Sequence, residues 1–330
     1  MPTITPMTSE QTVLHRLEQN RDRYLSGQEL AADLGISRSA VWKAMESLRD
    51  QGHVIEGISR RGYRLLTATT HLNKERLAGL LPSFEVHLFD SLDSTNRYAK
   101  VLASEHGQRP AVVVATYQSG GRGRLGRTFF SPKGGLYLSV LLPITFNLES
   151  AQLITSAASV AALEAIEHVS GKQCQIKWVN DLYREGKKVC GILTEGVLAV
   201  ESGSLSAVVV GIGINFCIPQ AAFPEDLRPL ATSLYDGPDS VPPSFDANTL
   251  VSEVVHNLHA LVSRLPDRSF LSVYRSRSLL LGRKVVVHQG RQAFSAIAVG
   301  IDDDARLVVE DENGMQHVLS SAEISIRLEV

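Results

Sequence analysis

The sequence predicts an α+β protein of three domains, because three different patterns follow one another along the chain. Capped helices and a short hairpin pattern occupy residues 1–70, strands and helices alternate over 71–279, and closely spaced strands with turn signals fill 280–330. We therefore predict an N-terminal winged helix-turn-helix (1–70), a central α/β domain (71–279) and a C-terminal β-barrel-like module (280–330). The length of 330 residues agrees, since one domain takes about 100–200 residues.

The composition excludes several classes of protein. Lysine and arginine (33) nearly balance aspartate and glutamate (35), so a net charge of -2 excludes a polybasic nucleic-acid coat. Hydrophobic residues at 44% and charged residues at 21% are typical of a globular protein. No apolar run approaches the ~18 residues that a membrane span needs, and the N-terminus lacks the features of a signal peptide, so we expect a cytoplasmic protein. An odd number of cysteines without a C-x-x-C pair argues against disulfides and a cysteine-rich zinc site.

The first domain carries helix caps in the order of a helix-turn-helix. A capping box at Ser26 to Glu29 opens one helix, and Gly35 suits its left-handed C-terminal end. Ser37 then caps a second helix whose apolar residues recur at helical spacing. Two short β-type runs, at 53–55 and 63–66, predict a hairpin that forms the wing, followed by a polar linker at 67–71.

The second helix and the hairpin carry a local positive charge. Six basic and three acidic residues lie between Arg38 and Arg64, a balance of +3 in a chain of net charge -2. Exposed donors on the helix and at the hairpin tip suit base edges and phosphates of DNA. A solvated helix face, or a module that binds another protein, are the alternatives. The candidate DNA-binding residues are Arg38, Ser39, Trp42, Lys43, Arg60 and Arg61.

The central domain alternates two periodicities. Strands are predicted at 85–89, 111–117, 136–142, 175–178, 189–194 and 205–214, and helices at 149–168 and 250–265. Residues 219–245 hold six of the thirteen prolines and predict a long irregular segment of the kind that forms lids or binding loops. In the C-terminal module, Asn313-Gly314 predicts a type I′ hairpin turn.

A glycine-rich loop follows the second central strand. The sequence GRGRLGR at 121–127 contains G-x-G-x-x-G, but the segment after it leads to another strand and not to a helix, which argues against a dinucleotide-binding fold. No Walker A sequence is present. Three arginines among glycines instead suit the binding of phosphate or carboxylate. A mobile surface loop, or part of a dimer interface, is the alternative.

These motifs together resemble those of biotin–protein ligases. The resemblance rests on GRGRLG at 121–126, on KWVND at 177–181 with Lys188 and GIL at 191–193, and on DSTN at 93–96. GIGIN at 211–215 and ATSL at 231–234 are similar to two further family segments, and the five motifs occur in family order. The winged helix makes the chain similar to the bifunctional subclass, in which the ligase is also the repressor of biotin synthesis.

The resemblance implies both a fold and an activity. The fold is a class II synthetase-like α/β ligase domain with an SH3-like C-terminal β-barrel. The activity is ATP-dependent formation of biotinoyl-5′-AMP, with Mg²⁺, and transfer of biotin to a lysine of the biotin carboxyl carrier protein of acetyl-CoA carboxylase. Operator DNA and a homodimer of the adenylate-bound protein are the other implied partners. A biotin-sensing regulator without ligase activity, and a lipoate or octanoyl transferase, are the rival functions.

The resemblance also assigns site residues. The catalytic cations are Lys188, Arg124 and Arg122, and Asp181 is a possible Mg²⁺ ligand. The biotin-binding residues are Ser94, Thr95, Asn96, Gln118, Arg122, Gly123, Arg124 and Lys188. The residues for ATP or the adenylate are Phe129, Asn180 and Asn215. From the residues alone, a simple helix N-cap is the favoured interpretation of Ser94. A core aromatic is an equal alternative for Phe129, and an exposed turn residue is an equal alternative for Asp181.

Two further positions complete the prediction. Val179 stands where the family motif has proline, which loosens that turn without removing a polar group. Arg327 is a candidate for the ATP or carrier-protein side of the site, with an ordinary surface arginine as the alternative.

Overall fold

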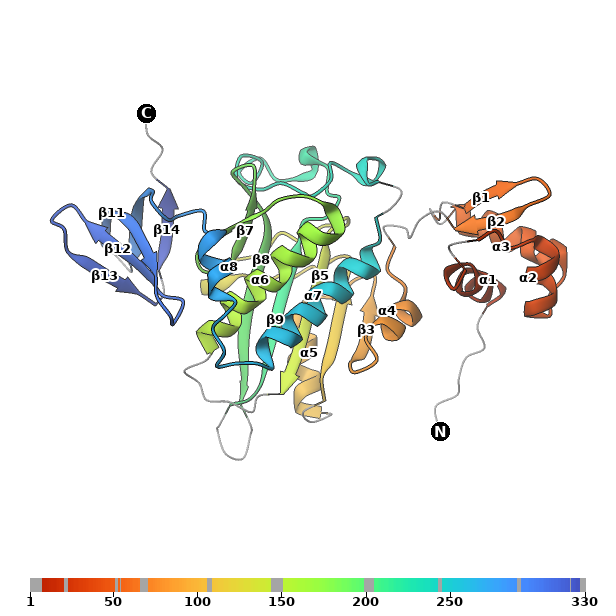
Figure 1. Cartoon of the computed structure of the whole chain (residues 1–330), viewed down its shortest axis with the longest axis horizontal. Helices are drawn as coiled ribbons and strands as arrows, with labels where there is room; N and C mark the ends of the chain where they lie inside the picture. The colour runs from red at the N-terminus through yellow and green to blue at the C-terminus, as the bar shows by residue number, and fades with distance from the viewer. Residues whose placement is uncertain are drawn as a thin grey trace. The chain divides into compact units, whose positions relative to one another are not determined.

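The computed structural model describes residues 8–20, 23–50, 53, 55–65, 71–105, 109–143, 151–198, 205–242, 245–289, 292–320 and 322–326. These form two compact units, one of residues 1–72 with 241–248 and one of residues 73–240 with 249–330 (Figure 1). The predicted linker at 67–71, except for its last residue, and Arg327 lie outside the described residues.

The N-terminal unit has three helices and a hairpin, as predicted for a winged helix-turn-helix. The helices are α1 (Ser9–Glu18), α2 (Gly27–Leu34) and α3 (Arg38–Asp50), and the antiparallel hairpin is β1 (Ile55–Ile58) with β2 (Gly62–Leu65). A continuous apolar core packs the three helices against both strands. The wing strand β1 begins at Ile55, the last residue of the predicted run 53–55, where its described ladder with β2 starts; residue 54 lies outside the described residues.

The predicted caps are present, with one correction. Ser26 Oγ accepts the Glu29 N–H at 3.0 Å, and Gly35 ends α2 with a left-handed φ of 63°. Ser37 Oγ accepts the Ala40 N–H at 3.1 Å at the start of α3. The Glu29 carboxylate does not complete the capping box; it forms an ion pair with Arg23 at 2.8 Å, because a guanidinium is a stronger partner than a backbone N–H.

A seven-stranded sheet forms the centre of the second unit. Its strands are β3 (Glu85–Phe89), β4 (Ala111–Ala115), β5 (Leu136–Pro143), β6 (Gln175–Lys177), β7 (Asp181–Arg184), β8 (Lys187–Leu198) and β9 (Leu205–Ile214). Their order in space is β3-β4-β5-β9-β8-β7-β6, with β3 and β4 parallel and every other neighbouring pair antiparallel.

Helices cover both faces of this sheet. Because side chains alternate along a strand, the odd-numbered residues of β9 pack with α5 (Thr95–Glu105), whose Ala99 and Leu102 share a core with Val209. The helix α6 (Ala151–Ser170) contacts the other face, and Figure 1 shows α6 and α7 (Ala247–Val262) in front of the sheet. The short helices α4 (Lys74–Leu80) and α8 (Leu271–Ser276) and the polar strand β7 were not predicted.

The C-terminal module is a five-stranded antiparallel sheet. The strands β10 (Lys284–Gln289), β11 (Gln292–Ile301), β12 (Leu307–Asp311), β13 (Gln316–Leu319) and β14 (Glu323–Ile326) lie in the order β13-β12-β11-β10-β14. The predicted hairpin at Asn313-Gly314 joins β12 to β13, but its predicted type is wrong. A type I′ turn needs positive φ at both central residues, and here only Gly314 has it, at 79°.

No helix in the described ranges is long and apolar enough to cross a membrane.

The wing generates a prediction about stability. Gly62 has a φ of 109°, and a Cβ there would lie 2.2 Å from the Leu25 carbonyl oxygen, whereas a Cβ at Gly27 would make an ordinary 3.5 Å contact with Tyr63. We expect Gly62→Ala to destabilise the winged helix by about 1–3 kcal/mol and Gly27→Ala to leave it nearly unchanged. Urea unfolding can be followed by ¹⁹F NMR of fluorotryptophan, because Trp42 reports on this unit and Trp178 on the other. Equal Trp42 midpoints for the two variants would contradict the prediction.

Candidate functional site

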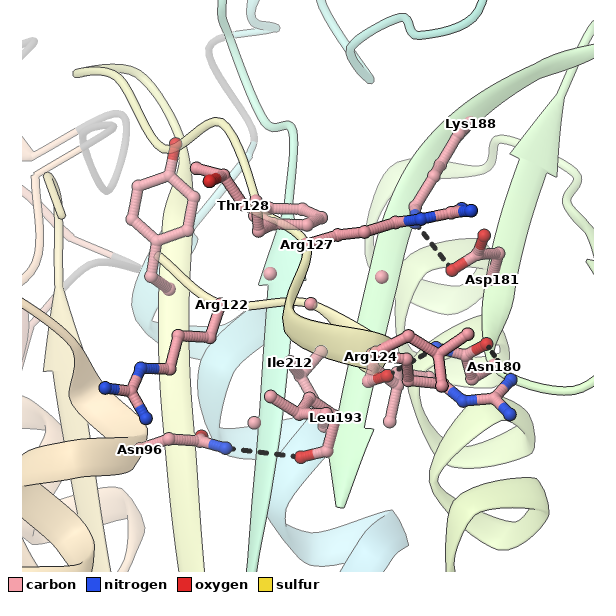
Figure 2. Close-up of a pocket in the computed structure, with 18 of the residues that line it drawn as sticks. Asn96, Arg122, Arg124, Arg127, Thr128, Asn180, Asp181, Lys188, Leu193 and Ile212 are labelled. Atoms are coloured by element: carbon pink, nitrogen blue, oxygen red, sulfur yellow. Dashed lines mark hydrogen bonds and ion pairs between the residues drawn. The ribbon is translucent and has the colours of Figure 1, made fainter. Parts of the chain in front are cut away.

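A pocket lies on the α5 face of the central sheet and collects most of the predicted site residues (Figure 2). Its walls come from the start of α5, the glycine-rich loop, the 177–181 turn, β8 and β9, with Ala322 and Ile324 from the C-terminal module. The predicted residues that line it are Ser94, Thr95, Asn96, Gln118, Arg122, Gly123, Arg124, Phe129, Asn180, Asp181 and Lys188. Asn215 is not among the lining residues.

The glycine-rich loop is a small hairpin closed on itself. The Gly123 N–H donates to the Arg127 carbonyl at 2.7 Å, and the Phe129 N–H donates to the Gly121 carbonyl at 3.0 Å. Leu125 and Gly126 make the turn with φ values of 56° and 75°. Only one turn of 3₁₀-helix is present, so the expected absence of a dinucleotide-binding helix after this loop is confirmed.

Cationic side chains occupy one side of the pocket. Lys188 Nζ lies 2.6 Å from Asp181 Oδ1 and 5.6 Å from the centre of the Phe129 ring. Arg124 donates to Asn180 Oδ1 at 3.2 Å. Figure 2 shows these two polar pairs on one side of the pocket and Arg122 with Asn96 on the other.

The backbone of Lys188 is held by the proline-rich segment after β9. Its N–H donates to the Leu230 carbonyl at 2.8 Å, and its carbonyl accepts the Thr232 N–H at 2.9 Å. Asn215 is buried and donates to the Thr232 carbonyl at 3.0 Å. Asn215 thus stabilises the segment that holds the Lys188 backbone, and it does not line the pocket.

Uncharged polar groups form a connected cluster at the other side. The Thr95 N–H donates to Gln118 Oε1 at 2.8 Å, and Thr95 Oγ1 lies 3.0 Å from the same oxygen. Gln118 Nε2 donates to Ser131 Oγ at 3.1 Å, and Ser139 Oγ lies 2.7 Å from Thr95 Oγ1 and 2.6 Å from Asn96 Oδ1. Sequence reasoning missed both serines, because a single serine in a strand or loop carries no pattern.

Three glycines make the floor of the pocket. Gly191 and Gly213 are directly paired across β8 and β9, and a Cβ at either would lie 2.7 or 2.5 Å from a ring atom of Phe129. A Cβ at Gly211 would lie 2.2 Å from Asn96 Oδ1. Glycine inside a strand marks a close approach, so this signal was present in the sequence. Phe129 is half-buried, with its ring against the glycine pair.

The 177–181 turn is fixed by hydrogen bonds to distant segments. Trp178 Nε1 donates to the Ala305 carbonyl of the C-terminal module at 2.9 Å, and the Tyr274 hydroxyl donates to the Val179 carbonyl at 2.9 Å. Asn180 Nδ2 donates to the Ile192 carbonyl at 2.6 Å. The turn that carries Asn180 is therefore well supported although Val179 replaces the proline of the motif.

Neither a cluster of metal ligands nor a disulfide is present among the described residues. Within the described ranges no three His, Cys, Asp or Glu side chains gather as a metal cluster, and Asp181 pairs with Lys188. Cys174, Cys190 and Cys217 are buried and unpaired, and burial raises the pKa of the Cys190 thiol. Cys190 is a buried residue of strand β8.

The candidate DNA contacts lie on the surface of the N-terminal unit. Arg38, Ser39, Trp42 and Lys43 are all exposed on α3, and 55% of Trp42 is accessible. A groove between α3 and the wing is lined in part by Arg38, Trp42 and Arg60. Arg60 adopts a left-handed φ of 66° at the wing tip.

Arg61, in contrast, is engaged within the wing. Its guanidinium and that of Arg64 each lie 4.7 Å from the centre of the Tyr24 ring. The Tyr24 hydroxyl donates to Glu56, which also pairs with Arg64 at 3.1 Å. The hydrogen bond from Tyr24, followed by that from Arg64, holds the pKa of Glu56 below its usual value. Arg61 thus stiffens the wing, a role that its position in the sequence did not indicate.

Comparison with known proteins identifies the family. Three family profiles match in succession: "HTH domain" over residues 9–64, "Biotin/lipoate A/B protein ligase family" over 88–215 and "Biotin protein ligase C terminal domain" over 280–327. The chain is 31% identical over 325 residues to the bifunctional ligase/repressor BirA of Bacillus spizizenii, covering 95% of this chain and 98% of the relative. The chain belongs to the biotin protein ligase family.

Another bifunctional relative and a solved structure of the family are also similar to this chain. The bifunctional ligase/repressor BirA of Escherichia coli K12 is 29% identical over 306 residues, covering 92% of each chain. The solved structure of biotin protein ligase from Aquifex aeolicus in complex with biotin and ATP is 28% identical with a TM-score of 0.61, over 74% of this chain and 99% of that one. The predicted family and its α+β fold class are confirmed.

The glycine floor of this biotin protein ligase can be tested without any ligand. We expect Gly213→Ala to destabilise the second unit by about 1–3 kcal/mol, because the new Cβ overlaps Phe129. Adding Phe129→Ala removes the overlapping ring, so the two changes should couple by about 1 kcal/mol or more in a double-mutant cycle measured by urea unfolding. Gly196→Ala on the neighbouring strand β8 meets only the end of the Leu205 side chain, so it should add independently to Phe129→Ala. Additivity in the Gly213 cycle would contradict the close packing.

Proposed function

We propose that the protein is an ATP-dependent biotin–protein ligase that also represses transcription by binding DNA. One observation carries the ligase activity: a single pocket joins an uncharged polar cluster to a cationic side with an aromatic ring over a glycine floor. Biotin has the matching polarity, since a neutral cyclic urea stands at one end of the molecule and a carboxylate at the other. We further propose that the protein works in the cytoplasm.

The cyclic urea is assigned to the uncharged cluster. Ser94, Thr95 and Gln118 offer hydroxyl and amide groups, which can match two N–H donors and one carbonyl acceptor without a charge; the Asn96 amide lies beside them but is bonded to Glu195 and Leu193. The carboxylate then extends towards Arg124 and Lys188. Phe129 and Asn180, on the same side as Lys188, are assigned to the adenine nucleotide. Asn215 supports the Lys188 backbone, and we no longer assign it to the nucleotide.

The first half-reaction joins two anions. A carboxylate oxygen of biotin attacks the α-phosphorus of ATP, a new P–O bond forms, and the bond to the β-phosphate breaks to release pyrophosphate. The barrier is largely electrostatic repulsion, so fixed cations near the reacting atoms lower it. Lys188 is mounted at the start of β8, and Arg122 and Arg124 approach from the loop with Gly123. Lys188 and Arg124 hold the carboxylate against the α-phosphate, whereas Arg122 lies on the other side of the pocket, beside Asn96.

A magnesium ion fits this site only together with the nucleotide. Mg²⁺ is commonly held by one or two carboxylates and by substrate phosphates, and Asp181 supplies one carboxylate beside Lys188. Mg²⁺ would neutralise part of the triphosphate charge when bound. The Asp181 carboxylate meanwhile keeps the Lys188 ammonium aimed into the pocket.

The second half-reaction transfers the biotinoyl group. The amine of a lysine on the biotin carboxyl carrier protein attacks the acyl carbon of the adenylate, the bond to AMP breaks, and the amine loses a proton. The hairpin of the glycine-rich loop covers one wall of the pocket, where it can keep water from the mixed anhydride until the lysine arrives.

A biotin-sensing regulator without ligase activity is the second candidate. Sensing biotin needs the uncharged cluster alone. Lys188 and Arg124 add groups that suit an α-phosphate, and the Phe129 ring against the glycine floor suits an adenine ring. A lipoate or octanoyl transferase is less suited, because neither acyl chain ends in a polar ring that the uncharged cluster could bind.

Pyrophosphate release tests the ligase. We expect the purified protein with Mg·ATP to release pyrophosphate when biotin is added, and not with lipoate or without an acid. Lys188→Ala should reduce the rate by about 10²–10³-fold, the usual loss when a transition-state donor is removed. Lys187→Ala is the matched control, because its ammonium donates to the Arg228 carbonyl at 3.0 Å outside the pocket; its rate should stay within about twofold. Absence of biotin-dependent release by folded protein would favour the sensor.

Repression is assigned to the N-terminal unit as a dimer. Arg38, Ser39, Trp42 and Lys43 would meet the major groove and Arg60 the adjacent backbone, with Arg61 bracing the wing. Two copies bind a two-fold operator more tightly than one, since each presents a recognition helix to one half-site. We infer that the adenylate-bound protein forms a homodimer.

Sedimentation and DNA binding test this linkage together. With biotin and Mg·ATP present, the sedimenting mass should double and the affinity for a two-fold operator fragment should rise by tenfold or more, falling again with salt as phosphate contacts are screened. Biotin alone is the control. An unchanged mass with the adenylate formed would contradict the proposed dimer.

A further inference from the structure

Glu195 is a half-buried carboxylate that the proposed reaction does not use. It lies on β8, and its side chain is 22% exposed. Asn96 Nδ2 donates to Glu195 Oε2 at 2.8 Å, and the Lys100 ammonium pairs with Glu195 Oε1. Two residues of α5, one turn apart, thus converge on one carboxylate of the central sheet.

Both polar atoms of the Asn96 side chain form hydrogen bonds within the protein. Its amide nitrogen faces Glu195 and, at 3.4 Å, the Leu193 carbonyl, a contact that Figure 2 draws as a dashed line. Its oxygen accepts from Ser139 at 2.6 Å. Gly211 leaves the space for this oxygen, since a Cβ there would lie 2.2 Å away. Asn96 therefore has no amide hydrogen left for a ligand.

The charge of Glu195 decides which way this amide points. An ionised carboxylate only accepts hydrogen bonds, so the amide nitrogen of Asn96 must face it and the amide oxygen must face Ser139. The Ser139 hydroxyl then donates to Asn96 and cannot donate to Thr95. The hydrogen in the 2.7 Å contact between the two hydroxyls must then come from Thr95, and Gln118 Oε1 is left with the Thr95 N–H at 2.8 Å. One charge thereby sets the donor and acceptor order of the whole cluster.

Glu195 is ionised at neutral pH. Burial raises the pKa of Glu195, but the hydrogen bonds from Lys100 and Asn96, with the positive charges of Lys100 and Arg122, outweigh it and hold the pKa below its usual value. Arg122 lies on the same side of the pocket as Asn96 in Figure 2, so the same carboxylate attracts the loop arginine.

We propose that Glu195 is a positioning residue that acts through Asn96 and Ser139 to fix the hydrogen-bond polarity of the cluster that receives the cyclic urea. The inference rests on the proposed function only for the identity of that ligand. Asn96 consequently transmits the donor and acceptor arrangement from Glu195 to Ser139 and does not contact the ligand. Ser94, Thr95 and Gln118 face the ligand.

Replacing the charge while keeping the shape separates this role from packing. In Glu195→Gln the side chain both donates and accepts, so Asn96 can turn its amide and reverse the donor order up to Thr95. We expect the Kd of biotin, measured by titration calorimetry without ATP, to rise about tenfold. The rate of pyrophosphate release at saturating biotin should stay within twofold, because Lys188 and Arg124, on the other side of the pocket, are unchanged. KM for biotin would then rise while kcat holds.

A matched glutamate controls for a general loss of charge. Glu253 on α7 is 28% exposed and pairs with His168 at 2.8 Å, outside the pocket. Glu253→Gln should leave the Kd of biotin within twofold. Equal biotin affinity in Glu195→Gln and the wild type would overturn the inference, whereas a wild type that does not bind biotin would refute the proposed function instead.

A double-mutant cycle tests whether the effect passes through Ser139. Ser139→Ala removes the hydroxyl between Asn96 and Thr95, so Glu195→Gln should cost little further biotin affinity in that background. If the fold-changes in the Kd of biotin for the two substitutions multiply in the double variant, Glu195 does not act through Ser139, and the proposal is wrong. Should Glu195→Gln not fold, Ser139→Ala alone decides: unchanged biotin affinity would contradict the proposal.

Discussion

The pocket depends on the absence of side chains at three points of two adjacent strands. Gly191 and Gly213 are paired across β8 and β9, and Gly211 lies two residues before Gly213 on the same face. Any Cβ at these points would overlap Phe129 or Asn96. The aromatic ring, the start of α5 and the loop that carries the arginines can approach the sheet only because the floor is bare backbone.

Two carboxylates organise the polar walls above that floor. Asp181 holds Lys188 at one side, and Glu195 orients Asn96 at the other. Both pairs combine a pocket-lining residue with a carboxylate on β7 or β8. The sheet thus supplies fixed negative charges that orient the donor groups of the pocket. Preorganisation of this kind lowers the reorganisation that binding requires, because the donors are aimed before the ligand arrives.

The sequence predicted the parts of this molecule that carry a pattern. The strands β3 and β9 match their predicted bounds, and the motif residues Thr95, Gln118 and Lys188 meet in one pocket. Isolated residues were missed, because Ser139 and Glu195 act through contacts between segments far apart in the chain. The short polar strand β7 was missed since its hydrogen bonds, and not its hydrophobicity, define it.

The hydrogen bond from Trp178 to Ala305 has a consequence for how the second unit comes apart. Arg275 adds a bond to the Ile301 carbonyl at 2.8 Å and an ion pair to Asp303 at 2.6 Å, so one loop of the C-terminal sheet is fastened to the turn before β7 and to α8. We expect local opening of that loop to remove one of the hydrogen bonds that hold the turn that carries Asn180. The stability of the C-terminal sheet and the order of this wall of the pocket are then linked.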